Sequence, residues 1–249
     1  MGTITLDEMD SIKLMNRIDS KYMCNEAKLV EVLNDAADMG YRACVIGGQR
    51  VTEYYSVYYD TSDLKMYMAH HNGRKVRQKV RVRTYLVSGL TYLEIKKKNN
   101  KGRTKKKRIA IPEDFRMNFA TSEEAADFLA KNSWWTVDQL TPEATTEFNR
   151  ITLVNAAKTE RLTIDTNLHF HNFRSNIDAD LRDAVIIELK QDGRAESQMK
   201  TILLKHRIFP FGVSKYCIAT ALTEPGVKRG RFKKKIRKIE KITNSKIIV

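Results

Sequence analysis

Three consecutive segments decide the fold of this chain: RKVRQKVRVRTYLVS (Arg74–Ser88), LTYLEIKKKN (Leu90–Asn99) and KGRTKKKRIAIP (Lys101–Pro112). Each is rich in the alternation of charged with aliphatic residues that is typical of a β-strand. Short turn sequences separate them, at Ser88-Gly89 and at Asn99 to Gly102. The pattern therefore predicts three antiparallel strands joined in a meander.

Basic residues share one face of each predicted strand, because alternate residues of a strand point to the same side. The second strand places Glu94 and Lys96 together, and the third places Lys105 and Lys107 on one face with Arg103. The first strand carries valines on one face and only basic residues and Tyr85 on the other, and these basic residues are Lys75, Arg77, Lys79, Arg81 and Arg83.

The repetition of this pattern points to an anionic ligand. A solvated face of a one-sided sheet would explain the charges of a single strand. On adjacent antiparallel strands, however, like charges stand about 5 Å apart and repel each other. A multiply charged anion bound among them would remove that repulsion. We therefore expect the cations to face inward in a curled sheet, with the aliphatic faces packed outward against helices.

The net charge also points to an acidic partner. The 249 residues carry a formal net charge of +15, and residues 74–108 and 224–249 together carry more than this whole excess. Nucleic acid, an anionic membrane surface and a polyanionic small molecule all fit such a charge. The three cysteines show no CxxC spacing, and no apolar run is long enough to cross a bilayer. We expect a cytoplasmic protein without a transmembrane segment.

The remaining sequence supplies further strands, at 16–24, 52–60, 146–155, 161–170 and 183–191. Amphipathic helices are predicted at 26–40, 62–73, 122–131, 195–207 and 211–222. We expect an α+β fold in which residues 1–223 form one domain and residues 224–249 form a basic C-terminal tail. A solvated, disordered end is the simplest interpretation of the tail, although it could also lie on an anionic membrane, hold an emerging product or bind nucleic acid.

Isolated acidic residues are candidate metal ligands, because hard divalent cations need carboxylate oxygens. Glu94 and Glu188 each stand two residues from a lysine, so acid and base point into the same space. Asp165 is a third candidate. The alternative for each acid is a salt bridge that holds its neighbouring lysine, and the sequence leaves both interpretations open.

An ordered set of segments gives the chain its resemblance to a known family. The segments are RIDSKYM (17–23), SVYYDTSDLKMY (56–67), KVRVRTY (79–85), YLEIKKKNNKGRTKKKR (92–108), EFNRITL (147–153), LTIDTNL (162–168), AVIIELK (184–190) and FGVSKY (211–216). Together they resemble the VTC domain of polyphosphate polymerases, within the triphosphate tunnel metalloenzymes that include the CYTH enzymes. The similarity extends from about Asn16 to Leu222.

This resemblance implies a function and a set of site residues. The fold would be an antiparallel β-barrel tunnel with flanking helices, in which polyphosphate grows from ATP with Mn²⁺ or Mg²⁺ as cofactor. Glu188 would bind the metal, with Glu94 as a second candidate ligand. The catalytic residues would be Arg81, Arg83, Lys96 and Lys215. The phosphate-binding residues would be Lys21, Arg81, Arg83, Lys96, Lys105, Lys107, Arg150, Ser214 and Lys215, although the run KKKR leaves the choice between Lys105 and Lys107 ambiguous.

Two other functions remain open at this stage. A triphosphatase acting on tripolyphosphate or a nucleoside triphosphate would use the same residues, with water as the acceptor in place of a phosphate chain. A non-catalytic binder of polyphosphate or nucleic acid would use the cations alone. Nucleic acid is disfavoured, because only Tyr85 and Tyr92 stand among the densest basic runs as stacking platforms.

Overall fold

The computed structural model describes residues 1–10, 12, 17–193 and 196–247, and it shows an α+β protein built on one large sheet. The strands are β1 (Gly2–Thr5), β2 (Ile18–Asn25), β3 (Arg42–Val45), β4 (Thr52–Asp60), β5 (Arg77–Tyr85), β6 (Leu90–Lys98), β7 (Thr104–Ala110), β8 (Thr141–Val154), β9 (Glu160–Asn172), β10 (Asp178–Leu181) and β11 (Ala184–Gln191). The α-helices are α1 (Leu6–Asp10), α2 (Glu26–Asp38), α3 (Lys65–His71), α4 (Glu123–Asn132), α5 (Gln198–Lys205), α6 (Lys215–Thr223) and α7 (Gly230–Thr243). None of the described helices has both the length and the apolar character needed to cross a membrane.

The main sheet runs in the order β2-β11-β9-β8-β4-β5-β6-β7, and all of these neighbours are antiparallel. The predicted meander is confirmed, since β5 pairs with β6 and β6 with β7. Two short additions extend the sheet: β10 pairs with β9, and β3 pairs with β8 and, in parallel, with β1.

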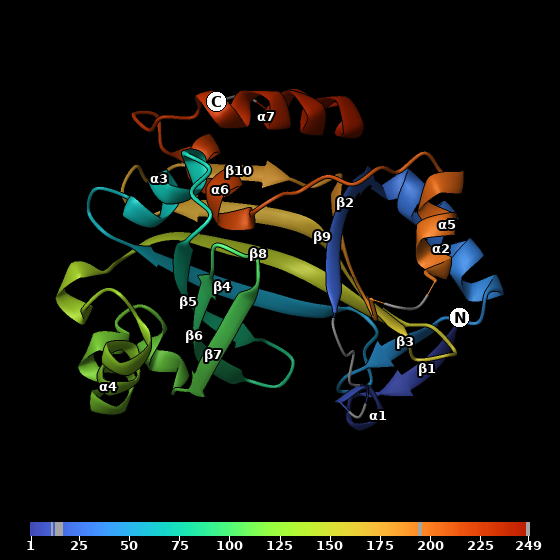
Figure 1. The fold of residues 1–249 in the computed structure, drawn as a ribbon, viewed down its shortest axis with the longest axis horizontal. Helices are drawn as coiled ribbons and strands as arrows, with labels where there is room; N and C mark the ends of the chain where they lie inside the picture. Colours follow the sequence, from blue (N-terminus) through green and yellow to red (C-terminus); the bar gives the residue numbers. More distant parts are fainter. Residues whose placement is uncertain (11, 13–16, 194–195, 248–249) are drawn as a thin grey trace.

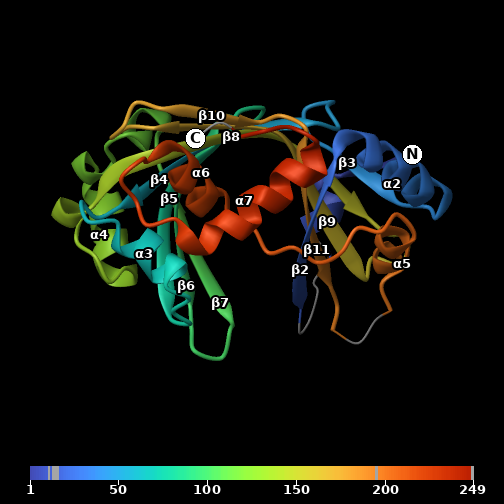
Figure 2. The same ribbon diagram turned by 90° about the horizontal axis from the view of Figure 1, so that it is seen from above.

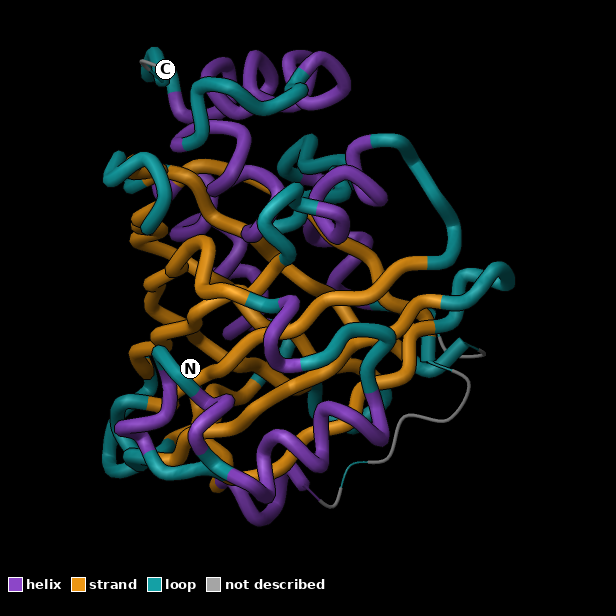
Figure 3. Tube along the Cα trace, turned by 90° about the vertical axis from the view of Figure 1, so that its left-hand side faces the viewer, coloured by secondary structure: helices purple, strands orange, loops and turns teal. Residues whose placement is uncertain are grey.

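The expected α+β fold with a curled antiparallel sheet is confirmed, and the sheet is strongly curled but not closed (Figures 1, 2 and 3). Its edge strands β2 and β7 are not paired with each other in the described ladder. The edge strand β7 carries Lys or Arg at four successive positions, 105–108, and charged side chains on an edge oppose further strand pairing. Asn16, which we placed at the start of β2, lies outside the described residues.

Helices cover the convex side of the sheet in two groups. Helix α4 packs against the aliphatic faces of β5 and β6, where Val80 and Leu93 are buried against Leu129. Helices α2 and α5 cover β9 and β11 in the same way, with Val32 and Ile202 among the buried residues. The valines and leucines that alternate with the charges therefore face outward into helices, as expected, and leave the charged side chains on the other face.

Helices α6 and α7 lie on the concave side (Figure 2). Most of α6 is buried, and its apolar residues pack on Tyr58, Phe148 and Phe170. Helix α7 corrects the expectation of a disordered tail, because Phe232 and Ile239 join the same core while the basic residues between them stay at the surface. The basic tail is thus largely an amphipathic helix packed on the domain.

Replacing Phe232 by alanine tests this packing. The ring is 4% exposed and lies against Tyr67, His70 and His71. Its loss should lower the free energy of unfolding by about 3 kcal/mol, through lost burial and the cavity left behind. Chemical denaturation would measure the change. The control is Lys233→Ala on the exposed side of the same helix, which should change stability by less than about 0.5 kcal/mol. Equal effects of the two changes would contradict the docked position of α7.

Candidate functional site

Charged residues from seven neighbouring strands converge on the concave side of the sheet, together with the start of α6. We call this side the inner face. The strand registers place these residues on it in cross-strand pairs, so that Arg81 lies opposite Glu94, Arg150 opposite Asp165, and Glu188 opposite Lys21. The predicted site residues that the structure brings together here are Lys21, Arg81, Arg83, Glu94, Lys96, Arg150, Glu188, Ser214 and Lys215.

Glu94 is held by two cations on the inner face. Its Oε2 accepts hydrogen bonds from Arg81 Nε at 2.8 Å and Nη2 at 2.5 Å, and its Oε1 accepts one from Lys106 Nζ at 3.1 Å. Burial would raise the pKa of this carboxyl, but the nearby cations, Arg81 foremost, outweigh it and hold the pKa well below its usual range. Both carboxylate oxygens are therefore committed to ion pairs, as in the salt-bridge alternative for this residue.

Arg83 and Lys96 are two inner-face cations that form no ion pair with a described acidic residue. Arg83 Nε donates to Ser56 Oγ at 2.9 Å, and its guanidinium lies over the rings of Tyr54 and Phe148. Burial, followed by the neighbouring cations, lowers the pKa of Arg83 to about 10. The pKa of Lys96 falls well below its ordinary value because of Arg81, burial and Arg83, in that order. These two cations are the parts of the inner face that most need an anion.

Asp165 joins β8, β9 and α6. It accepts hydrogen bonds from Arg150 Nε at 2.6 Å and Nη2 at 2.8 Å, and its Oδ2 also accepts one from Lys215 Nζ. Lys215 Nζ also lies 4.3 Å from the centre of the Phe148 ring. Burial above all, with Arg150 in addition, lowers the pKa of Lys215 to about 8 although Asp165 opposes this. Asp165 therefore tethers two cations, and its 4% exposed side chain has little room for a metal ion.

Ser214 links α6 to β5. Its hydroxyl caps the helix by accepting from the backbone N–H of Cys217, and it also accepts from Lys79 Nζ at 2.6 Å. The cap fixes where α6 begins. It thereby sets the position of Lys215, the first residue of the helix, above β8.

Glu188 is the most accessible of the three carboxylates, with a side chain 26% exposed against 1% for Glu94 and 4% for Asp165. Its Oε1 lies 2.7 Å from Lys21 Nζ. Burial opposes ionisation, but Lys21 and then Lys190 outweigh it and lower the pKa of Glu188 to about 2. Directly opposite in β9, the buried hydroxyl of Thr163 has no hydrogen-bond partner among the described residues. This corner thus offers an ionised carboxylate to a ligand, next to a buried hydroxyl without a partner among the described residues.

Strand β7 presents Lys106 and Arg108 to the inner face, which corrects the assignment of Lys105 and Lys107. Lys106 pairs across the strands with Lys96 and Arg108 with Glu94, so Lys105 and Lys107 point to the other side. The run KKKR contains no apolar residue to mark a face. Ile109 was the available signal, because it packs with the outer cluster under α4 and fixes Lys107 on that same side.

The sequence analysis missed the aromatic part of the inner face. Tyr54, Tyr58 and Phe148 lie beneath the guanidinium groups of Arg81, Arg83 and Arg150. The Tyr58 hydroxyl accepts from Arg81 Nη1 at 3.0 Å, and the nearby cations lower its pKa to about 8 against the effect of burial. Only the pairing of β4 with β5 and β8 shows that these rings share a face with the cations, and such pairing is not visible in the sequence of β4 alone.

A metal site made wholly of protein ligands is not found in the described residues, since no three His, Cys, Asp or Glu side chains are grouped to hold one. Mg²⁺ and similar ions are, however, commonly held by one or two carboxylates together with substrate phosphates. Glu188, with its accessible oxygen and the unpartnered Thr163 hydroxyl opposite, fits that arrangement. Glu94 fits it poorly because both of its oxygens are already engaged.

A solved structure of another protein shares this fold at low sequence identity. A candidate adenylyl cyclase from Hippeastrum, described as having a dominant triphosphatase activity, has a TM-score of 0.55 at 12% identity; the match covers 82% of this chain and 95% of that one. A candidate adenylate cyclase from Vibrio parahaemolyticus has a TM-score of 0.48 at 10% identity, over 81% and 97% of the two chains. No curated protein matches this sequence.

The family assignment comes from the sequence itself. The family model of the VTC domain matches residues 16–224, which include every strand of the curled sheet except β1. The matched region also contains the cations and carboxylates of the inner face. The expectation from the sequence motifs is thus confirmed: the chain belongs to the VTC domain family.

Proposed function

We propose that the protein is a polyphosphate polymerase, which transfers the γ-phosphoryl group of ATP to a growing inorganic polyphosphate chain on the inner face. The observation that carries this proposal is the presence of a buried Arg83 and a half-buried Lys96, two cations without an acidic partner among the described residues. Such groups are costly unless an anion neutralises them. Membership of the VTC domain family supports polyphosphate as that anion.

The residues of the inner face have distinct roles in this proposal. Arg83, Lys96 and Lys215 bind phosphate oxygens. Arg150 and Lys21 add further positive charge around the bound phosphates. Arg81 is oriented by its paired hydrogen bonds to Glu94, which leaves it charged and fixed in place. Lys106 and Arg108 take the places that the sequence had suggested for Lys105 and Lys107. Together these groups stabilise the charge that spreads over the phosphoryl oxygens during transfer.

The transfer is an in-line substitution at phosphorus. A terminal oxygen of the polyphosphate chain forms a bond to the γ-phosphorus, the bond from that phosphorus to the β–γ bridging oxygen breaks, and ADP leaves with the electron pair. A phosphate oxygen is already ionised at neutral pH, so no general base is needed. Bound Mn²⁺ or Mg²⁺ would neutralise charge on the phosphates. Glu188 would hold that ion, and Lys21 orients the Glu188 carboxylate through its 2.7 Å ion pair.

The product formed from ATP distinguishes the polymerase from a triphosphatase that uses the same residues. We expect incubation with ATP and Mn²⁺ to yield a ladder of polyphosphate chains on a polyacrylamide gel. An Arg83→Ala variant should yield none, because the γ-phosphate loses a cation that has no acidic partner. Release of free phosphate without a ladder would exclude the polymerase and leave the triphosphatase.

Neutralising the two candidate metal ligands one at a time separates their roles. Glu188→Gln should lower kcat about a hundredfold, the scale of about 2.7 kcal/mol of lost transition-state stabilisation, while tripolyphosphate still binds. Glu94→Gln should mainly lower the melting temperature, because Arg81 would lose its buried partner. Steady-state kinetics at varied Mn²⁺ and thermal melts of both variants provide the comparison. A Glu188→Gln variant with unchanged turnover would remove Glu188 from the metal site.

The affinity for polyanions should depend on pH through Lys215. Because the pKa of Lys215 is about 8, its side chain is positively charged below pH 8 and loses this charge above pH 8. Binding of tripolyphosphate should therefore be constant below about pH 7 and weaken by up to about tenfold per unit above pH 8. Calorimetric titrations at pH 7, 8 and 9 measure the trend, and Lys215→Gln should flatten it. An affinity that rises with pH would contradict this role of Lys215.

A further inference from the structure

A cavity of about 550 Å³ lies outside the inner face, at the end of the edge strand β2. Its walls come from β2, the start of α2, the turn after α5 and the C-terminal half of α7. The Asn25 side chain joins two of these walls, since its Nδ2 donates to the carbonyl oxygen of Ile242 at 3.2 Å. None of the inner-face residues assigned to phosphate or metal lines this cavity. The helical tail therefore helps to build a second enclosure.

The lining of this cavity is basic. Among the described residues that line it, none is acidic, and the basic ones are Lys28, Lys205, His206, Arg207 and Lys238. A volume of this size is typical of pockets for small molecules. The combination predicts that an occupant would be anionic.

Three of these residues already have acidic partners outside the lining. Lys28 Nζ lies 2.8 Å from Glu31, and Lys205 Nζ lies 2.8 Å from Asp35. Both ring nitrogens of His206 contact carboxylates, at 2.9 Å from Glu31 and 2.8 Å from Asp35. These contacts position the three side chains and leave little of their positive charge unpaired.

Arg207 and Lys238 are different, because neither has an acidic partner among the described residues. Lys238 Nζ only lies over the Phe211 ring, 4.8 Å from its centre. Arg207 occupies the left-handed backbone position that follows α5, with φ of 56°, where glycine is the unstrained choice. Arginine at this position carries backbone strain that glycine would not. Two cations from separate elements thus remain free to bind one ligand.

The same cavity has an apolar part. Ile208 and Ile242 line it, and Phe209 contributes a ring that is 56% exposed. An inorganic anion would gain nothing from such surface, whereas an aromatic ring can stack on an exposed phenyl group. The lining therefore suits a molecule with both a phosphate group and an aromatic or apolar part.

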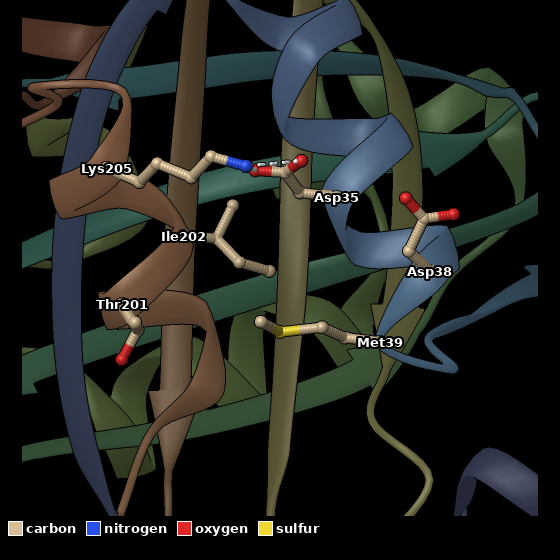
Figure 4. Close-up of a pocket in the computed structure, with 6 residues that line it drawn as sticks. All are labelled: Asp35, Asp38, Met39, Thr201, Ile202 and Lys205. Atoms are coloured by element: carbon tan, nitrogen blue, oxygen red, sulfur yellow. Dashed lines mark hydrogen bonds and ion pairs between the residues drawn. The ribbon is translucent and has the colours of Figure 1, made fainter.

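A neighbouring cavity has a lining of different charge. It has about 220 Å³ and lies between α2 and α5, where Lys205 is paired with Asp35 and Met39 and Ile202 form an apolar floor (Figure 4). Asp38 adds a further negative charge there. Among the described residues that line this smaller cavity no cation is unpaired, so it does not suit an anion.

We propose that the cavity formed by β2, α2, α5 and α7 is a second binding site for a phosphorylated organic molecule of nucleotide size. Arg207 and Lys238 bind the phosphate group, and Phe209 stacks on the organic part. The site shares no residue with the inner face, so it does not depend on the proposed polymerase activity.

Binding of ADP to the full chain tests the site, with one equivalent of tripolyphosphate present to occupy the inner face, because an excess would also compete for Arg207 and Lys238. We expect calorimetry to show one equivalent of ADP bound. Arg207→Gly and Lys238→Gln should each weaken it about tenfold or more, the scale of one charge-assisted hydrogen bond. Arg207→Gly is a favourable variant because glycine accepts the left-handed backbone, so its melting temperature should not fall. The matched control is Arg237→Gln, the neighbouring residue of α7 that does not line the cavity.

Three outcomes would overturn the proposal. The first is the absence of ADP binding once tripolyphosphate is present. The second is binding that Arg207→Gly and Lys238→Gln leave unchanged. The third is equal affinity for pyrophosphate and ADP, which would indicate a plain anion site without a role for Phe209. In each case the inner-face variant Arg83→Ala reports separately on the proposed polymerase, since Arg83 lies outside the cavity.

Discussion

Repulsion between cations on neighbouring strands is the constraint around which the structure is organised. The inner face reduces it by distributing carboxylates among the cations, so that Glu94 lies between Arg81 and Lys106 and Asp165 between Arg150 and Lys215. Aromatic rings stabilise some of these cations through cation–π contacts. After this neutralisation a small excess of positive charge remains on the inner face. A bound polyanion would contact the cations that carry this excess.

Burial of the outer face of the same strands offsets the free-energy cost of placing so many charges on the inner face. Alternation leaves aliphatic side chains opposite the charges, and their burial under α2, α4 and α5 supplies the hydrophobic stabilisation of the sheet. Helix α6 then packs onto the apolar end of the inner face and brings Ser214 and Lys215 to β5 and β8. Aliphatic packing thus fills the outer face and the apolar end of the inner face, and the charged side chains are left on the rest of the inner face.

The sequence predicted the strands and their faces well wherever apolar residues marked one side. Arg81, Arg83 and Glu188 were assigned correctly to the charged face because valine, isoleucine or leucine alternates with them. The assignment failed in β7, where four basic residues follow one another and only Ile109 reveals the phase. Whether β2 and β7 pair was not predictable, because it depends on two edges that are far apart in the chain.

The C-terminal tail is the second region where the prediction from the sequence was wrong. Its charge suggested a solvated end, yet Phe232, Ile236 and Ile239 recur at helical spacing and pack on the core. The pattern was present in the sequence but was masked by the basic residues around it. Similarly, the roles of Tyr54 and Phe148 beneath the arginines depend on long-range pairing of β4 with β8, which no local pattern encodes.

The opening of the sheet between β2 and β7 has a mechanical consequence. A closed barrel can widen only by breaking a ladder of backbone hydrogen bonds, whereas here β2 and β7 can separate without losing any that joins them. The resistance to opening is then set by side-chain packing rather than by a backbone ladder. A long polymer would not need to be threaded by its end; it could be laid in along its length and released the same way.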